Sequence, residues 1–319
     1  MTKIAVAALT CRRPRMLARL LESYERLKEP EGVEVLYLIV DNAPDAPVAA
    51  DVAAWQRKTR KSVIYVIEPE PGIPYGRNRA LDEAIANGAD WLTFVDDDET
   101  VDPDWLTAIV AHEKRERSHL VGGPVRCEPP AGSLSPLERL VFNGVRGRYR
   151  RKEEKNARRR AAGDDAGVTI ITNNWLGDVA WLREAGVRFD TALRFTGGSD
   201  TALYHAARRA GAKTSWCPEA IVYEEVPRER ISFAYQFARA RDQAATSYLR
   251  KQADERRNVV SAVAAIVGKF IVGTALLVAA PFTGGRTLVD SARSFGWGVG
   301  YGYALAGRKS RHYEALQGD

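Results

Sequence analysis

The sequence predicts an α/β protein built on a doubly wound, mostly parallel sheet with helices on both faces. Two observations lead to this fold class. Short apolar runs typical of buried strands alternate with stretches whose apolar residues recur at helical spacing. The breaks between them are rich in Pro, Gly, Asn and Asp, which favour turns. A chain of 319 residues can hold one large domain, or one domain with an appendage.

The N-terminal elements follow in order. We expect strands at 3–9, 33–40, 63–67 and 91–95, with helices at 14–27 and 48–58 between the first three. Pro14 stands where the first of these helices begins, which suits its fixed φ. A rigid Pro- and Gly-rich loop over 69–74 then leads into a helix from Arg77 to Asn87, which Gly88 closes.

The second half is less regular. We expect helices at 103–117, 178–185, 198–210 and 230–252, strands at 119–126, 213–217 and 220–224, and an apolar run at 168–172. Residues 128–165 combine Pro, Gly and many charges, so they are predicted to form a mobile basic loop. The α/β domain is expected to cover residues 1–250, with a helical tail over 251–319.

Charge and cysteine content exclude several classes of protein. The net charge is +6, and arginines crowd residues 146–160, which favours a phosphate-bearing ligand or lipid head groups. The three cysteines have no CxxC spacing, which argues against a zinc site or a disulfide framework and fits a reducing cytosol. No GxGxxG follows the first strand, no P-loop motif occurs and no signal peptide is visible. No nucleic-acid reader motif accompanies the arginines, so no nucleic-acid partner is expected.

Three consecutive aspartates, Asp96, Asp97 and Asp98, directly follow the strand at 91–95. The carboxyl ends of parallel strands are where open α/β sheets bind ligands. Carboxylates packed together repel each other unless a cation lies between them. Their oxygens suit Mg²⁺ or Mn²⁺, ions that commonly bridge to a substrate phosphate. The alternative is an acidic surface loop, and position alone leaves both interpretations open.

Two further candidates lie on the N-terminal half of the same sheet. Asp41 ends the second strand, so it shares an edge with the aspartate triplet and can accept hydrogen bonds from a base N–H or from ribose. An ordinary Asp-Asn-x-Pro turn is the alternative. Arg77 stands at the expected start of a helix, where anions bind, although a solvated helix arginine is the competing interpretation.

The C-terminal half adds two more candidates. Asp200 follows Ser199 in the first turn of the helix expected at 198–210, where it can be a general base or an ordinary helix cap. Trp175 follows Asn173 and Asn174 in an expected loop, and an aromatic side chain beside amides can bind a sugar ring. A tryptophan is also a common core residue, so this assignment stays open.

Taken in order, these motifs carry a resemblance to a known family. They are Thr10-Cys11-Arg12-Arg13-Pro14, Val40-Asp41-Asn42, Gly76-Arg77-Asn78, Phe94-Val95-Asp96-Asp97-Asp98, Asn173-Asn174, Ser199-Asp200 and Trp216-Cys217-Pro218-Glu219. Over residues 1–250 the chain resembles the family 2 inverting glycosyltransferases, which have the GT-A fold. Residues 94–106 and 225–227 are most similar to the glucosyltransferases of succinoglycan-type exopolysaccharide synthesis.

The resemblance implies a role at each matching position. Thr10 and Arg12 would line the nucleotide pocket, and Asp41 would hold the uracil. Arg77 would bind the diphosphate. Asp96 and Asp97 would lie between the ribose and the metal ion, and Asp96 would also contact the ion. Asp98 would ligate Mg²⁺ or Mn²⁺, and Asp200 would be the catalytic base. Asn174, Trp175 and Ser199 would contact the acceptor. The chain departs from the family pattern at Ser199, where the family usually has Glu, and at Glu224-Glu225, where it often has His.

The implied reaction transfers a sugar, a hexose such as glucose, from a UDP-sugar to a hydroxyl of a polyprenyl-diphosphate-linked saccharide. Such a reaction belongs to exopolysaccharide or cell-surface polysaccharide synthesis. The alternatives are a nucleotidyltransferase, or a catalytically degenerate, membrane-associated binding protein. The sequence specifies neither the sugar nor the linkage.

The tail contains two apolar segments. Residues 259–280 are long enough to span a bilayer but contain Lys269, and 294–306 are shorter. A membrane hairpin, an interfacial helix pair and helices packed on the catalytic domain all remain open. We expect the tail to associate with the membrane, which would place the protein at the cytoplasmic face of the inner membrane.

Overall fold

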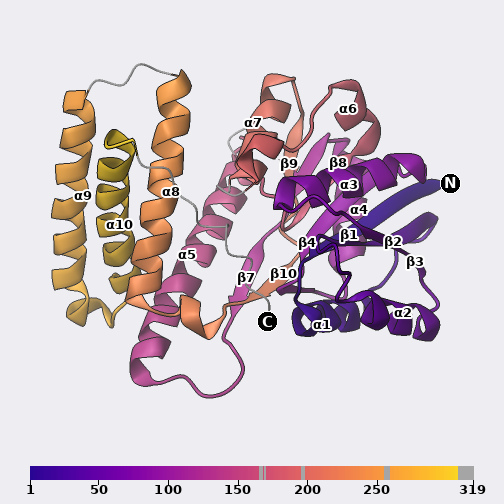
Figure 1. Cartoon of the computed structure of the whole chain (residues 1–319), viewed down its shortest axis with the longest axis horizontal. Helices are drawn as coiled ribbons and strands as arrows, with labels where there is room; N and C mark the ends of the chain where they lie inside the picture. The colour runs from indigo at the N-terminus through magenta and orange to yellow at the C-terminus, as the bar shows by residue number, and fades with distance from the viewer. Residues whose placement is uncertain (165–167, 169, 195–197, 255–258, 308–319) are drawn as a thin grey trace.

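The computed structural model describes residues 1–164, 168, 170–194, 198–254 and 259–307 (Figure 1). Its main sheet has seven strands in the order β3-β2-β1-β4-β8-β6-β9. These are β1 (Thr2–Thr10), β2 (Val33–Asp41), β3 (Ser62–Ile67), β4 (Trp91–Asp96), β6 (Leu120–Gly122), β8 (Trp175–Asp178) and β9 (Thr214–Trp216). Strands β1 to β4 pair in parallel, and β8 runs antiparallel to both β4 and β6. The expected mostly parallel, mixed sheet is therefore confirmed.

A second, three-stranded sheet lies beside the main one. It has the order β5-β10-β7, from β5 (Glu99–Val101), β10 (Val222–Glu225) and β7 (Val125–Glu128). The strand expected at 119–126 is thus divided between the two sheets. Pro124 lies at the division and has no N–H to donate, so a single strand ladder cannot continue through it. The apolar residues 168 and 170–172 are outside any strand.

Helices cover both faces of the main sheet. One face packs on α1 (Pro14–Glu25), α2 (Ala49–Lys58) and α4 (Trp105–Glu116), and the other on α3 (Ile73–Ala86), α6 (Val179–Glu184) and α7 (Ser199–Arg209). Side chains of β1 alternate between these two cores: Ile4 and Val6 enter the first, Ala5 and Ala7 the second. A strand buried on both faces needs apolar residues at every position, which is why it reads as an unbroken apolar run.

Strand register brings the expected edge residues together. Thr10 pairs with Asp41 across β1 and β2, while Leu9 pairs with Asp96 across β1 and β4. The carboxyl ends of the three central parallel strands therefore meet at one edge, and polar side chains follow each of them.

The region predicted to be a mobile basic loop is mostly a helix, so that prediction is wrong. Helix α5 runs over Pro136–Ala161. Ser135 accepts a hydrogen bond from the N–H of Glu138, whose side chain accepts one from Ser135 N–H, and this capping box stabilises the first turn. Val141 and Phe142 pack in a small core, while charged residues cover the rest and obscure the apolar spacing.

Three long helices follow in the described part of the chain after residue 230: α8 (Phe233–Asp254), α9 (Val259–Ala279) and α10 (Leu288–Leu305). In Figure 1 they lie side by side at the end of the molecule, with α5 between them and the sheets. Helix α10 packs on both α8 and α9. A Cβ added at Gly296 or Gly300 would lie 2.3 or 2.2 Å from a backbone oxygen of α8, so only glycine permits this approach.

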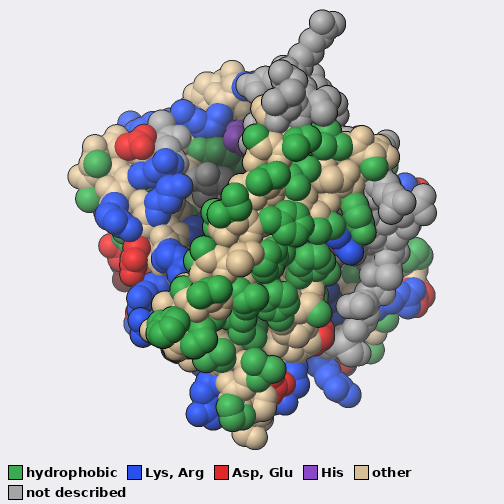
Figure 2. Space-filling model, turned by 90° about the vertical axis from the view of Figure 1, so that its left-hand side faces the viewer, with side chains coloured by type: hydrophobic (Ala, Val, Ile, Leu, Met, Phe, Trp, Pro, Cys, Tyr) green, Lys and Arg blue, Asp and Glu red, His purple; other side chains and the backbone are tan. Residues whose placement is uncertain are grey.

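Helix α9 carries an exposed apolar face. Ser261–Ala279 is long and apolar enough to cross a membrane, and Ile271 and Val278 are 65% and 64% exposed. Figure 2 shows the hydrophobic side chains gathered over this end of the molecule. We call this surface the α9 face; its strongly exposed members are Val263, Val267, Phe270, Ile271, Val272, Leu277 and Val278. It is the largest exposed apolar group among the described residues.

Two glycines of α10 provide a matched test of the packing. Gly300→Ala should destabilise the protein by about 1–3 kcal/mol, because the new methyl meets the carbonyl of Arg241. Gly302→Ala, at an open position of the same helix, should be neutral or stabilise by up to about 1 kcal/mol. Denaturant midpoints of the two variants measure the difference, and equal shifts would rule out close α8–α10 packing.

Candidate active site

A cavity of about 1000 Å³ opens at the carboxyl edge of β1, β2 and β4. Its floor includes Thr10, Asn42 and the three aspartates, and the start of α7 forms one side. Side chains from α5, α8 and α10 form the opposite wall. The cavity therefore lies between the α/β domain and the C-terminal helices.

The aspartate triplet is divided among different partners. Asp97 is nearly buried and accepts hydrogen bonds from Thr10 Oγ1 at 2.9 Å and Arg13 Nη1 at 3.0 Å. Burial raises the pKa of Asp97 to about 7, although Arg13 opposes the rise. Asp98 lies 4.0 Å from Arg13 and 3.5 Å from Arg230. Arginines thus partly neutralise both side chains.

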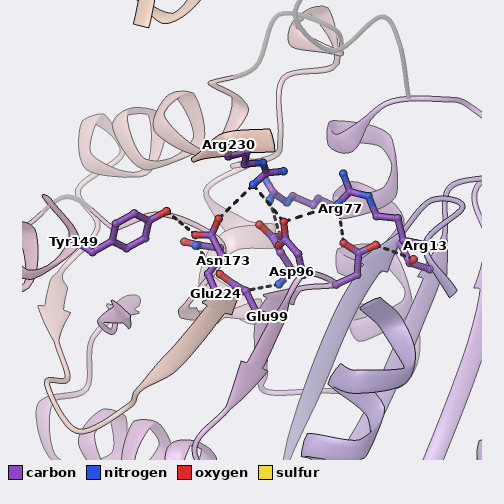
Figure 3. Close-up of polar contacts among 11 residues, drawn as sticks. Arg13, Arg77, Asp96, Glu99, Tyr149, Asn173, Glu224 and Arg230 are labelled. Carbon is purple, nitrogen blue, oxygen red and sulfur yellow. Dashed lines mark hydrogen bonds and ion pairs between the residues drawn. The ribbon is translucent and has the colours of Figure 1, made fainter. Parts of the chain in front are cut away.

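Arg77 connects the third aspartate to the start of α7. Its guanidinium donates to Asp96 at 3.2 Å and also to Asp200, as Figure 3 shows for the first pair. The arginine is 4% exposed, whereas both carboxylates reach the cavity. Helix α3 begins at Ile73, earlier than expected, so Arg77 lies in its second turn and not at its N-terminus. Gly76 lets this turn pack directly on Leu9 of β1.

Backbone geometry at the start of α7 positions Asp200. Gly198 has φ 86°, a left-handed conformation that favours glycine, and it precedes the first turn. The N-cap has no side-chain hydrogen bond, and Asp200 contacts Arg77 instead. Asp200 lies in the first turn of α7, where a carboxylate suits the helix dipole, and its contact with Arg77 is additional to that placement. Ser199 donates a long hydrogen bond of 3.4 Å to the same carboxylate.

A buried network of hydrogen bonds lies next to the aspartate triplet, and we did not predict it from the sequence. Glu99 accepts from the N–H of Asp96 and from Asn173 Nδ2, both at 2.8 Å (Figure 3). Glu224 accepts from the Tyr149 hydroxyl at 2.6 Å and from Arg230 at 3.4 Å. Burial and the neighbouring carboxylates Asp96, Asp98 and Glu224 raise the pKa of Glu99 well above its usual range. In the sequence, this network is indicated only by the Glu224-Glu225 pair at a strand end and by Glu99, the acidic residue that follows the triplet.

The electrostatics fit an oxygen-preferring cation. Burial, and after it the charge of Glu224, raise the pKa of Asp98, so the ionised carboxylate is disfavoured there without a compensating cation. Carboxylate oxygens are the donors that Mg²⁺ and Mn²⁺ prefer. Within the described residues, no three Asp, Glu, His or Cys side chains already form a metal-binding group. A bound ion would therefore need additional oxygens from its ligand.

Most of the site residues named from the sequence line this cavity. They are Thr10, Arg77, Asp96, Asp97, Asp98, Ser199 and Asp200. Asp41 lies just outside the lining and is fully buried. Its Oδ2 accepts from the Tyr65 hydroxyl at 2.8 Å, while Oδ1 has no hydrogen-bond partner among the described residues.

Arg12 is not part of the lining, contrary to expectation. Its guanidinium makes a bidentate ion pair with Asp45, at 2.7 Å for each contact. Arg12 has φ 56°, and the turn instead sends the next residue, Arg13, to the aspartates. Neighbouring arginines in a tight turn face different directions, which sequence spacing cannot resolve.

Two residues expected to contact the acceptor are structural. Trp175 is 1% exposed and stacks on Phe94 in the core, with ring centroids 5.9 Å apart. Asn174 accepts from Trp105 Nε1 at 2.9 Å and donates to the carbonyl oxygens of Pro124 and Ala220. Both belong to strand β8 or the turn before it, not to an open loop. Asn173, one position earlier, lines the cavity instead.

The fold and the site together define an α/β protein that binds its ligand at the carboxyl ends of parallel strands. Residues 2–245 match the model of the glycosyltransferase-like family 2. Over 234 residues the chain is 31% identical to the succinoglycan biosynthesis protein ExoM of Rhizobium meliloti (strain 1021), covering 73% of this chain and 70% of the relative. The chain belongs to glycosyltransferase-like family 2 and is a glycosyltransferase. Membership of this family decides against the nucleotidyltransferase.

Solved structures with a similar course of the chain include TarS of S. aureus. One TarS crystal structure aligns with a TM-score of 0.49 and 14% identity, covering 95% of this chain and 55% of TarS. This chain therefore spans about half of that TarS chain. A shorter form, TarS 1–349 in complex with UDP, aligns with a TM-score of 0.48 and 14% identity. The alignment covers 99% of this chain and 95% of that TarS chain.

Proposed function

We propose that this glycosyltransferase inverts the anomeric centre of a UDP-sugar, with a divalent cation, and transfers a hexose such as glucose. The acceptor is a hydroxyl of a polyprenyl-diphosphate-linked saccharide in exopolysaccharide or cell-surface polysaccharide synthesis. The observation that carries the proposal is that Asp200 and the aspartate triplet line one cavity with Arg77 between them.

The edge of the sheet beside β2 suits a nucleoside. The Asp41 carboxylate is buried beside Asn42 of the cavity lining; its Oδ1 lacks a hydrogen bond of good geometry among the described residues, although the backbone N–H groups of Ala43 and Val48 lie close enough to lower its pKa. A small opening of the lining around Asn42 would let a ring N–H, such as that of uracil, satisfy this oxygen. Asp96 and Thr10 lie at the adjacent strand ends, within the span of a ribose.

The diphosphate side of the donor would face Arg77 and Asp98. Arg77 supplies a buried guanidinium, which binds phosphate oxygens strongly in a site with little water. Asp98, together with Asp96, would hold Mg²⁺ or Mn²⁺, and the bound ion would neutralise charge on the leaving diphosphate. Arg13 and Arg230 offset the remaining carboxylate charge.

Asp200 is the proposed base. Arg77 contacts the Asp200 carboxylate and fixes its orientation at the cavity surface. From there it can take the proton of an acceptor hydroxyl as that oxygen attacks the anomeric carbon. The sugar–phosphate bond breaks as the new glycosidic bond forms, so an α-linked donor gives a β-glycoside without a covalent intermediate.

A membrane-bound acceptor accounts for the exposed α9 face. Soluble monomers rarely expose a large contiguous apolar patch, and this patch lies on a helix long enough to cross a bilayer. The relative named for succinoglycan biosynthesis is consistent with a polysaccharide product. We therefore place the enzyme at the cytoplasmic face of the inner membrane, where nucleotide-sugars are available.

Replacement of the base tests the mechanism. Asp200→Asn should lower kcat about 10²–10⁴-fold, because the amide cannot accept the proton, while the UDP-sugar dissociation constant stays within about threefold. Turnover assays and calorimetric titration measure the two quantities. Asp82→Asn, an exposed carboxylate paired with Arg188, is the control and should retain wild-type turnover. Near-normal turnover of Asp200→Asn would reject this assignment.

The metal assignment has a binding test as well as a kinetic one. We expect Mn²⁺ to tighten UDP binding at least tenfold, and Asp98→Ala to abolish this gain because the ion loses its protein ligand. Calorimetry with Mn²⁺ or with EDTA measures the effect directly. UDP binding and sugar transfer that are unchanged in EDTA would contradict a metal-dependent mechanism.

Membrane association through the α9 face can be measured by flotation with anionic lipid vesicles. The full-length protein should float, and the double substitution Ile271→Glu with Val278→Glu should reduce the bound fraction at least tenfold by adding charge to the apolar face. Leu137→Glu, at a 66% exposed position of α5, is the matched control. A wild-type protein that stays unbound at low salt without detergent would refute the association.

A further inference from the structure

The cavity has a second charged region opposite the aspartates. Arg148 and Arg151 of α5, Arg239 of α8 and Arg293 of α10 line it, and we call them the basic wall. Three separate helices contribute these guanidinium groups, so their convergence depends on the tertiary fold. The donor site described above uses none of them.

Arg293 is a largely buried member of the wall that donates to side-chain amides of α8. Its Nη1 and Nη2 donate to two neutral amides, Gln236 at 3.4 Å and Gln243 at 2.7 Å. Its Nε is buried without a hydrogen-bond partner in the described chain. Burial, together with the charges of Arg148 and Arg239, lowers the pKa of Arg293 to about 10. Holding a cation under these conditions is costly, and an anionic ligand would remove much of the cost.

One carboxylate holds the two arginines of α5. Asp290 accepts from Arg148 Nη1 and from Arg151 Nη2, both at 2.6 Å, and it lies one turn before Arg293 on α10. The ion pairs fix both guanidinium groups at the α5–α10 contact. A single carboxylate shared by two arginines leaves N–H donors available to a ligand with several anionic oxygens.

The position of the wall indicates what kind of anion it fits. Helix α10, which carries Arg293, packs directly on α9, the helix that carries the exposed α9 face. Lys152 of α5 lines the same cavity as Asp200 and Glu224; burial lowers its pKa, and the charges of these two carboxylates oppose that shift. The wall is therefore located between an apolar surface and the proposed base, within one continuous cavity.

We propose that the basic wall is a second anion site, distinct from the donor site, which binds the diphosphate of a lipid-linked acceptor. The inference rests on the proposed function and deepens it by assigning the acceptor's anchor. The lipid chain would run along α9 and α10, and the saccharide would extend from the wall towards Asp200. A diphosphate ester carries enough charge to engage several guanidinium groups at once, whereas the donor's diphosphate is already matched by Arg77 and Asp98.

Farnesyl diphosphate is a suitable probe for full-length protein in neutral detergent with saturating UDP and Mg²⁺. It should bind without displacing UDP. Arg293→Gln and Arg148→Gln should each weaken it about 10–100-fold, because each removes a charged donor. Arg293→Lys should weaken it less than Arg293→Gln. The control Arg150→Gln, at an exposed α5 position outside the cavity, should stay within twofold.

Two companion ligands identify the source of the affinity. Inorganic pyrophosphate should bind more weakly than farnesyl diphosphate but with the same dependence on Arg293, and farnesol should show no such dependence. Pyrophosphate binding as tight as that of farnesyl diphosphate would overturn the lipid-linked ligand. Displacement of UDP, or equal affinity in Arg293→Gln with its unfolding midpoint and UDP affinity intact, would overturn the second site.

The outcome is separable from that of the proposed function. Failure of UDP-sugar turnover together with Arg293-dependent farnesyl diphosphate binding would reject the transfer reaction and leave the anion site standing. Normal turnover with a soluble saccharide acceptor, combined with Arg293-independent binding of farnesyl diphosphate, would reject the anion site alone.

Discussion

The buried contact of Arg77 with Asp96 and Asp200 is the interaction on which the site depends. It joins the end of a central strand to the first turn of α7, segments more than a hundred residues apart in the chain. A buried guanidinium without carboxylate partners would cost several kcal/mol, so the two acidic side chains and the arginine must be placed together. The fold achieves this through Gly76, which packs α3 on β1, and Gly198, which starts α7.

The burial pattern of parallel strands explains which part of the fold could be predicted from the sequence. Strands buried on both faces must be apolar throughout, and polar residues directly after them must lie at the carboxyl edge. These two local rules predicted β1 to β4 and the location of Asp41 at the same sheet edge as the aspartate triplet, which the register confirms. The ordered motifs then supplied the family, since no single motif separates a ligand site from an ordinary turn or cap.

The wrong predictions for Arg12, Trp175 and helix α5 have one physical cause in common: each depends on contacts between distant parts of the chain. Whether Arg12 or Arg13 enters the cavity depends on one turn, and whether Trp175 faces solvent or Phe94 depends on the sheet that β8 joins. Neither is encoded within a few residues. Helix α5 was missed for a related reason: its apolar residues form a short stripe among many charges, and its stability comes from a capping box and packing against α10.

The same long-range dependence brings the C-terminal helices to the wall of the cavity. Helix α10 can lie close to α8 because Gly296 and Gly300 have no side chain, so their backbone packs directly against the backbone of α8. This packing places Arg293 on the cavity wall. The surface that carries the α9 face is thus rigidly connected to the surface that faces Asp200. An acceptor held by a membrane must present its hydroxyl at a fixed distance from the base, since a displacement of about 1 Å can cost a hundredfold in rate. In the proposed reaction, close helix packing, more than any single side chain, would supply that fixed distance.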